Sequence, residues 1–539
     1  MSPLPFSARP AVALAICWSI GIAHAMPLMV TTTADELDPI GTPGSGLSLR
    51  EALRDVPSGE TILFDPAVFW SATASKITLN AALGDLIPPQ NSTIDASPLP
   101  YNVTIDGGTG TNRIFQIAAG RTFNLLNLTL TGGNGTGTVS PGNGGAIFNF
   151  GTLSLTNCRI EGNSASNYGG AILSYSIFGA STVTLTRCTL SNNTSSNHAP
   201  CIFNWAQGAT ATLVIDSCTL SGNSGSQQSV TAGALYNYSA GGLASATIRR
   251  STITGNSTRH AAAVLNYSNA SSGNATLSLE RCTVSGNLAH PTDGFGGACW
   301  NIVGSGTASI STKDSIIAAN SAAFYEDIFL QHGTITSQGG NLIGEADVFT
   351  MTPGPGDQLG NINNLINPQL APLGDYGGPT QTMALGPTSP ARNAGQTGGL
   401  SLDQRGAMMV GLPDCGAYES GNPTNFAAYI YELLPLTANH LASADADADA
   451  ATNEAEYLAL TNPADPSSIL RPQATQLGNS IVISFPTSAG RNYTLEESET
   501  LLPGSWTASQ TVAGNGNVKQ FTIPMISGAR RFFRVQPSL

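Results

Sequence analysis

A six-residue motif returns about every 30 residues through the middle of the chain and constrains its fold more than any other feature. It reads CRIEGN, CTLSNN, CTLSGN, STITGN, CTVSGN and SIIAAN, starting at residues 158, 188, 218, 251, 282 and 315. Two further apolar segments, such as GTLSLTN and GGAIFNF, are phased with it, so each period holds three short strand-like segments separated by Gly, Asn and Ser turns. A period near 30 with three strands and no helix predicts an all-β fold, a parallel β-solenoid in which each repeat is one coil.

Stacking of the coils turns the motif into columns, because equivalent residues of successive coils lie about 4.8 Å apart. The first column is Leu128, Cys158, Cys188, Cys218, Ser251, Cys282 and Ser315. An aliphatic column follows two positions on, and an Asn column five positions on: Asn163, Asn193, Asn223, Asn256, Asn287 and Asn320. We expect the first two columns to face the interior, since strand alternation points them the same way. The Asn column falls at a turn, where Asn tolerates left-handed geometry and its amide can bond to the next coil.

The cysteine spacing argues against a disulfide framework. Cys218 and Cys282 are two coils apart, about 9–10 Å, which exceeds the roughly 7 Å Cα limit for a bridge. Neighbours among Cys158, Cys188 and Cys218 come within range, but parallel side chains on one face are poorly aimed at each other. No His accompanies the column as a zinc site would require. We therefore predict reduced, structural cysteines.

Charge argues against nucleic-acid binding, and the N-terminal residues indicate an exported protein. Charged residues are 10% of the chain and the formal net charge is −13, which offers no electrostatic footprint for nucleic acid. Residues 1–25 read as a secretory signal peptide, with Arg9, the apolar run AVALAICWSIGIA and a small-x-small cleavage site at Ala23–Ala25. No later segment is apolar enough to cross a bilayer, so we expect no transmembrane segment after cleavage.

Three segments resemble a bacterial surface-protein family. VTTTADELD, LSLREAL and GETILFD resemble the CSLREA segment that opens bacterial surface β-helix proteins, with Leu47 in place of the usual Cys. The GGAI repeats resemble those of polymorphic outer membrane proteins, and residues 367–419 resemble the choice-of-anchor segment that closes such helices. The resemblance implies a right-handed parallel β-helix located extracellularly or on the outer surface of a bacterium. It brings no catalytic residue set.

The sequence divides into six parts. They are a signal peptide (1–25), an N-terminal cap and first coils (26–120), β-helix repeats (121–350), a closing segment (351–420), a calcium-loop linker (421–470) and a small antiparallel β-sandwich (471–539). The cap contains a predicted helix in LSLREALRD, which begins with a capping box of Ser48 and Glu51.

The linker carries a candidate calcium loop within SADADADAATNEAEY. Asp445, Asp447, Asp449, Asn453 and Glu456 occupy loop positions 1, 3, 5, 9 and 12, and Ala451 would add its carbonyl at position 7. This spacing converges oxygen ligands on a hard cation and resembles the single calcium-loop linkers of secreted bacterial proteins. Ala450 stands where Gly normally permits the sharp turn at position 6. A solvated acidic linker is the alternative interpretation.

Two functions fit the sequence. A structural or adhesive surface module, binding a polysaccharide or cell-surface glycan, is favoured. Its candidate contacts are Trp205, Tyr236, Tyr238, Tyr267 and Trp300. The alternative is a polysaccharide lyase or glycoside hydrolase acting on an acidic polysaccharide, which needs clustered carboxylates. The few acids of the repeats share no position in adjacent coils; they are Glu161, Asp216, Glu280, Asp293 and Asp314.

Overall fold

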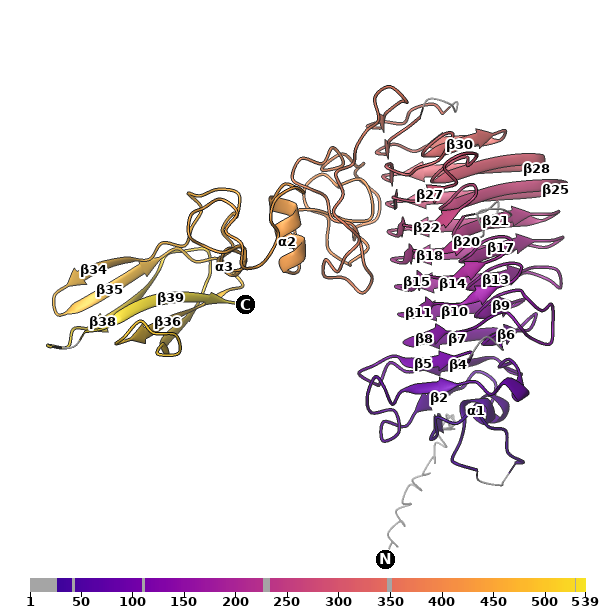
Figure 1. Ribbon diagram of the computed structural model, residues 1–539, viewed down its shortest axis with the longest axis horizontal. Helices are drawn as coiled ribbons and strands as arrows, with labels where there is room; N and C mark the ends of the chain where they lie inside the picture. The colour runs from indigo at the N-terminus through magenta and orange to yellow at the C-terminus, as the bar shows by residue number, and fades with distance from the viewer. Residues whose placement is uncertain (1–26, 41–43, 109–111, 226–232, 347–350, 529) are drawn as a thin grey trace, which may run out of the picture.

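The chain forms a right-handed parallel β-solenoid followed by a small antiparallel β-sandwich, as the computed structural model in Figure 1 shows. The structure describes residues 27–539 except 41–43, 109–111, 226–232, 347–350 and 529. The predicted signal peptide, residues 1–25, lies outside the described residues.

Two sides of the solenoid belong to one sheet of seventeen strands, which is joined because two long strands run across the corner between the sides. The first side comprises β6 (Phe115–Ile117), β9 (Ile147–Asn149), β13 (Ile172–Tyr175), β17 (Ile202–Ala206), β21 (Leu235–Ser239) and β30 (Ile328–Gln331). The second side comprises β1 (Leu28–Val30), β2 (Thr61–Phe64), β4 (Ser92–Asp95), β7 (Thr122–Leu126), β10 (Thr152–Thr156), β14 (Ser181–Thr186), β18 (Ala211–Asp216), β22 (Leu243–Arg249) and β31 (Thr334–Ser337). The long strands are β25 (Val264–Glu280) and β28 (Cys299–Lys313).

The third side is a separate parallel sheet of eleven strands, and five of the coils add one strand each to a short sheet that follows it. The third side comprises β3 (Lys76–Thr78), β5 (Val103–Asp106), β8 (Leu128–Thr131), β11 (Arg159–Glu161), β15 (Thr189–Ser191), β19 (Thr219–Ser221), β23 (Thr252–Thr254), β26 (Thr283–Ser285), β29 (Ile316–Ile317), β32 (Leu342–Ile343) and β33 (Gln358–Leu359). The short sheet comprises β12 (Ser164–Ala165), β16 (Thr194–Ser195), β20 (Ser224–Gly225), β24 (Ser257–Thr258) and β27 (Leu288–Ala289).

The interior columns lie where the repeat predicts them. Ile160 pairs with Leu190 and Leu190 with Leu220, in unbroken register along the third side. The first column is buried throughout, and all seven cysteines of the described residues are free and buried. The column fills the interior of the solenoid with small side chains. Its hydroxyls and thiols bond to backbone carbonyls, as Ser251 does to Arg249 and Cys158 to Leu125.

The Asn column is a buried hydrogen-bond ladder. The amide of Asn163 donates to Asn193 Oδ1 over 3.0 Å, and Asn193 donates in the same way to Asn223 over 2.9 Å. The left-handed backbone falls one residue before the Asn, for example at Asn192 (φ 55°) and Gly222 (φ 64°). The left-handed conformation of the turn thus belongs to the residue before each ladder Asn and not to the Asn itself. The amide of the Asn points inward.

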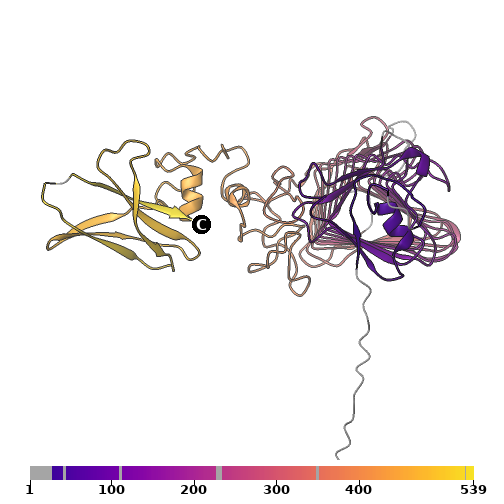
Figure 2. The ribbon, with the colours of Figure 1, turned by 90° about the horizontal axis from the view of Figure 1, so that it is seen from below.

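Helix α1 (Leu49–Asp55) lies at the N-terminal end of the solenoid, and Figure 2 shows it across the opening of the coils. Its capping box is present: Ser48 Oγ accepts from Glu51 N over 3.1 Å, and Glu51 Oε2 accepts from Ser48 N over 2.9 Å. Leu49, Ala52 and Leu53 are buried in the main core. A short 3₁₀ helix, η1 (Ala81–Leu83), follows in the first coils.

The closing segment folds back along the third side. Gln404 bonds to the outward hydroxyls of Thr219 (3.0 Å) and Thr252 (2.7 Å), and Ala417 N donates to Thr283 Oγ1 over 3.0 Å. Residues 380–417 therefore cover the outer surface of β19, β23 and β26, which lie before the last coils of the solenoid.

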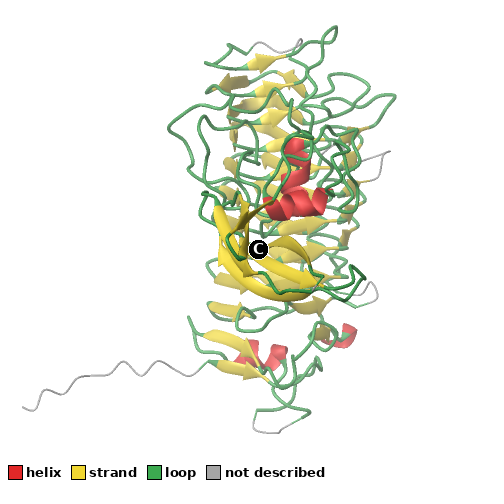
Figure 3. Ribbon diagram, turned by 90° about the vertical axis from the view of Figure 1, so that its left-hand side faces the viewer, coloured by secondary structure: helices red, strands yellow, loops and turns green. Residues whose placement is uncertain are grey.

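Two helices connect the closing segment to the sandwich, which stands away from the solenoid in Figures 1 and 2 and lies in front of it in the view of Figure 3. They are α2 (Phe426–Leu433) and α3 (Asn453–Ala459). One sheet of the sandwich has the order β34 (Gln473–Leu477), β35 (Ser480–Phe485) and β38 (Lys519–Pro524). The other has the order β37 (Thr507–Ala513), β36 (Asn492–Ser498) and β39 (Phe532–Ser538). Within the described residues, no helix combines the length and the apolar character needed to cross a membrane.

Candidate calcium loop and aromatic stripe

Three of the four acidic residues predicted to bind calcium lie together just before α3, and the fourth, Glu456, lies within α3. Ligand oxygens of Asp445, Asp447 and Asp449 lie within 4.8 Å of one another. The loop is folded on these carboxylates: Ala450 N donates to Asp445 Oδ2 over 2.9 Å, and Ala451 N donates to Asp449 Oδ1 over 2.7 Å. Among the described residues, this is the only group of three or more His, Cys, Asp or Glu whose ligand atoms approach so closely.

Four oxygens of the loop are buried and have no hydrogen-bond partner. They are Asp447 Oδ2, Asp449 Oδ2, Asn453 Oδ1 and Glu456 Oε2. The amide nitrogen of Asn453 donates to the carbonyls of Asn439 (3.0 Å) and Leu441 (2.9 Å), which turns its oxygen away from these groups. A buried acceptor without a partner costs about 1–3 kcal/mol, so these four oxygens are costly to the fold unless a further group binds them.

The pKa values of two of the loop acids also fit a cation-binding role. Burial, followed by the charges of Asp447 and Asp449, raises the pKa of Glu456 to about 7, and burial and Asp449 raise the pKa of Asp447. Carboxylates that repel one another in a partly buried loop favour a bound cation, which removes the repulsion.

Position 6 of the loop keeps the backbone that glycine usually supplies. Ala450 has φ 75° and Ala448 has φ 65°, both in the left-handed region that L-residues enter at a cost of roughly 1–2 kcal/mol. Calcium ligation by the Ala451 carbonyl stays a prediction. The alanines thus adopt the turn that the loop spacing requires, with strain that a bound ion would offset.

The loop lies between the solenoid and the sandwich. On the sandwich side, Arg491 donates to the carbonyls of Leu458 (3.1 Å) and Tyr457 (3.3 Å) at the end of α3. On the solenoid side, Tyr418 of the closing segment donates to Glu432 of α2 over 2.5 Å. The hydroxyl of Tyr429 in α2 bonds to the carbonyl of Thr461, just after α3. These contacts join α2 and α3 to the closing segment on one side and to the sandwich on the other.

Aromatic side chains form a column on the outer surface of the first side, which we call the aromatic stripe: Tyr175, Trp205, Tyr238 and Tyr267. All four are half-buried. Successive ring centroids lie 4.5, 5.9 and 5.4 Å apart. The parallel register places each ring beside the next, so the stripe runs along the solenoid axis.

The predicted glycan contacts divide between the stripe and a column beside it. Trp205, Tyr238 and Tyr267 belong to the stripe, whereas Tyr236 is buried and Trp300 is half-buried in the neighbouring column. Tyr236 stacks on Phe203 with ring centroids 4.7 Å apart. This neighbouring column supports the stripe from one side. Tyr175 was missed as a candidate, although its position in GGAILSY matches that of Trp205 in PCIFNW.

Amide side chains flank the stripe. The hydroxyl of Tyr175 donates to Gln207 Oε1, and Asn269 Nδ2 donates to the hydroxyl of Tyr238 over 3.5 Å. Gln207 and Asn269 are exposed. The surface therefore combines apolar ring area with amide and phenol groups that can exchange hydrogen bonds with a polar ligand.

Every acid considered for catalysis in the repeats forms an ion pair with arginine. The closest oxygen–nitrogen distances are Glu161–Arg159 2.8 Å, Asp216–Arg250 2.6 Å, Glu280–Arg249 3.8 Å, Asp293–Arg259 2.6 Å and Asp314–Arg281 3.5 Å. Each pair neutralises a carboxylate locally and does not bring two acids together.

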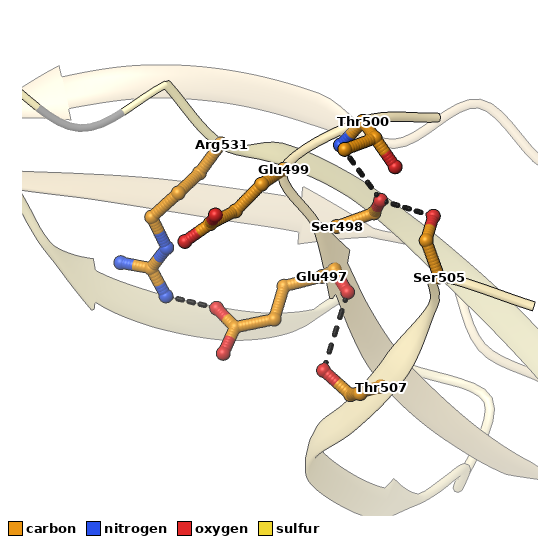
Figure 4. Close-up of a pocket in the computed structure, with 7 residues that line it drawn as sticks. All are labelled: Glu497, Ser498, Glu499, Thr500, Ser505, Thr507 and Arg531. Atoms are coloured by element: carbon orange, nitrogen blue, oxygen red, sulfur yellow. Dashed lines mark hydrogen bonds and ion pairs between the residues drawn. The ribbon is translucent and has the colours of Figure 1, made fainter. Parts of the chain in front are cut away.

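A further cavity of about 370 Å³ lies in the sandwich, where Figure 4 shows its lining side chains. Arg531 forms an ion pair with Glu497, and Ser498 and Ser505 bond to each other over 2.6 Å. Thr507 donates to the carbonyl of Glu497 over 3.3 Å. Sequence patterns indicated only strands here, since the residues come from three separate segments.

No protein-family model matches the chain, and no curated protein matches it significantly.

Proposed function

We propose that the protein is an exported structural or adhesive module of a bacterium, secreted or associated with the cell surface, that binds a glycan chain along the aromatic stripe. The observation that carries this proposal is the column of four half-buried rings in parallel register with exposed amides beside it. Export and surface location are supported by the sequence of residues 1–25 and by the resemblance of the CSLREA and choice-of-anchor segments.

The geometry of the stripe suits an extended ligand. The rings repeat with the coil spacing of about 4.8 Å and form an open row, which an extended ligand can follow. A compact ligand would instead need a closed pocket. Sugar rings carry apolar C–H groups on their faces and hydroxyls at their edges. Aromatic surface would contact the former, and Gln207 and Asn269 would bond to the latter.

Calcium is the cofactor in this proposal. Asp445, Asp447, Asp449, Asn453 and Glu456 would hold it, with the Ala451 carbonyl, and the four buried oxygens without partners fit that role. The ion would neutralise the repelling carboxylates and fix the start of α3. Its role would be structural, making the connection between solenoid and sandwich rigid. Helix α1 would act as the N-terminal cap that a solenoid needs.

A single panel tests adhesion against the enzymatic alternative. The full chain is incubated with calcium and a set of neutral glycans and polyuronates, and both binding and ultraviolet absorbance from unsaturated products are followed. Binding without a rise in absorbance or new reducing ends supports the adhesive module. Turnover of a polyuronate would instead establish the polysaccharide lyase or glycoside hydrolase.

A further inference from the structure

A second cavity, of about 330 Å³, lies near the C-terminal end of the solenoid. Its lining comes from the segment before β30 and from two later segments, and comprises Ala322, Ala323, Phe324, Tyr325, Glu326, Glu345, Ile362 and Leu365. A volume of this size falls in the range of small-molecule sites, roughly 300–1,000 Å³. The cavity is separate from the stripe, the calcium loop and the cavity of the sandwich.

Apart from Glu326 and Glu345, the lining is mostly apolar, and two of its rings stack on other aromatic rings. Tyr325 stacks on Phe329 with centroids 4.5 Å apart and an interplanar angle of 12°. Phe324 stacks on Phe295 at 5.1 Å. Phe324 is nevertheless 50% exposed and Ile362 69% exposed. Supported rings with exposed surface form a firm wall for an apolar group.

The two acids of the lining, Glu326 and Glu345, are linked by backbone hydrogen bonds to each other and to a third acid, Asp327. Glu345 is 3% exposed, and its Oε2 accepts from Glu326 N over 2.6 Å. Glu345 N in turn donates to Asp327 Oδ2 over 2.8 Å. Across the described ranges, no Lys, Arg or His forms an ion pair with Glu326, Asp327 or Glu345.

The absence of a countercharge sets this cluster apart from the acids of the repeats, each of which has an arginine. Burial and the charge of Glu345 raise the pKa of Glu326, as expected where like charges share a poorly solvated place. The carboxylates do not converge as those of the calcium loop do, since no metal-like grouping of ligand atoms is found at these residues. A charge spread along an apolar wall suits an organic cation better than a metal ion.

We propose that this cavity binds a small organic cation with an apolar body, such as a primary alkylammonium. Glu326 and Glu345 provide the countercharge, the rings of Phe324 and Tyr325 lie where they can face the cation, and Ile362 and Leu365 contact the alkyl chain. This binding site is independent of the proposed glycan binding, so either can fail without the other.

Hexylammonium, 1-hexanol and hexanoate are matched probes, because they share the alkyl chain and differ in charge. Each is titrated into the full chain in the same calcium-containing buffer, with dissociation constants from ligand-observed NMR. Hexylammonium should bind saturably and at least about tenfold more tightly than hexanol, with hexanoate weakest. Equal affinities for hexylammonium and hexanol would overturn the proposal, as would no binding of hexylammonium.

Two isosteric variants locate the site. Glu345→Gln and Glu326→Gln should each weaken hexylammonium binding about tenfold and leave hexanol unchanged. Glu499→Gln, at an exposed acid in the other cavity, serves as the control and should change neither. Glu326 is only half-buried, so its variant tests the proposal even if Glu345→Gln does not fold. Unaltered hexylammonium binding by folded Glu326→Gln would count against the assignment.

Discussion

Buried asparagines link successive coils of this solenoid by hydrogen bonds. The last Asn of the ladder also has a hydrogen-bond partner, which is a carboxylate. Asn320 ends the series of asparagines, and Asp327 takes the next position: its Oδ1 accepts from Asn320 N (3.2 Å) and Asn320 Nδ2 (2.9 Å). A carboxylate here completes the ladder but is 2% exposed. Burial raises the pKa of Asp327 to about 7, from an ordinary value near 3.8.

The raised pKa of Asp327 predicts how the stability of the protein changes with pH. Between about pH 4 and 7 the unfolded chain releases the Asp327 proton while the folded chain keeps it, so this residue lowers stability as the pH rises through that range. Asp327→Asn cannot titrate. The difference in thermal midpoint between Asp327→Asn and the parent protein should therefore shift in favour of the variant from pH 5 to pH 8. A difference that is constant with pH, measured by scanning calorimetry, would show that Asp327 does not titrate in this range.

At the scale of the elements, a second ladder of buried asparagines is interrupted in β13, where a serine takes the place of an asparagine. Asn204 donates to Asn237 (2.8 Å) and Asn237 to Asn266 (2.8 Å), inside the first side. Ser174 takes the position before Asn204, but its hydroxyl donates to Ser181 over 3.1 Å. Asn204 Oδ1 is consequently buried without a hydrogen-bond partner.

Completing this ladder should stabilise the protein. Ser174→Asn supplies the missing donor, and Ser181→Ala makes room with the residue that Ala211 provides in the next coil. The double variant should gain about 1 kcal/mol, the usual net value of one hydrogen bond. Ser181→Ala alone is the control and should not gain stability. Denaturant unfolding measures the difference, and a loss of stability in the double variant would mean that the larger amide does not fit.

The calcium loop is the second element whose role can be tested, and α3 offers a matched pair of acids. Glu456 is fully buried with an oxygen that lacks a partner, whereas Glu454, two residues earlier, is exposed. Glu456→Gln should weaken calcium binding at least about tenfold, because it removes a charged ligand. Glu454→Gln should bind as the parent does. Isothermal titration with CaCl₂ measures both.

Two results would contradict the calcium assignment. One is a parent protein that releases or absorbs no heat with calcium, and the other is equal loss in the two variants. Limited proteolysis gives a second measure: excess chelator should expose the segment around residues 439–461 to cleavage in the parent protein, and calcium should protect it.

At the scale of the whole molecule, the repeats and the contacts between residues close in sequence were predictable, whereas the contacts between distant non-repeated segments were not. Register such as Ile160 with Leu190 follows from a motif that recurs at a fixed spacing, and the calcium-loop acids are close in sequence. Gln404 and Thr252 are bonded across 152 residues, with no periodic pattern to bring them together. The same is true of Glu326 and Glu345, whose contact depends on the path of an irregular segment. Sequence periodicity determines stacking, whereas surface cavities depend on side chains of unrelated segments.

The central claim is that the aromatic stripe binds glycan, and affinity electrophoresis through gels containing a panel of polysaccharides tests it most directly. The full chain, loaded with calcium, should be retarded by at least one polysaccharide. Trp205→Ala combined with Tyr238→Ala should weaken this retardation about tenfold or more while the fold is kept, as checked by circular dichroism. Trp70→Ala is the matched control, since Trp70 is 69% exposed and far along the chain from the stripe, and it should migrate like the parent. If the folded double variant is retarded like the parent, or if no polysaccharide retards the parent, the stripe is not a glycan-binding surface.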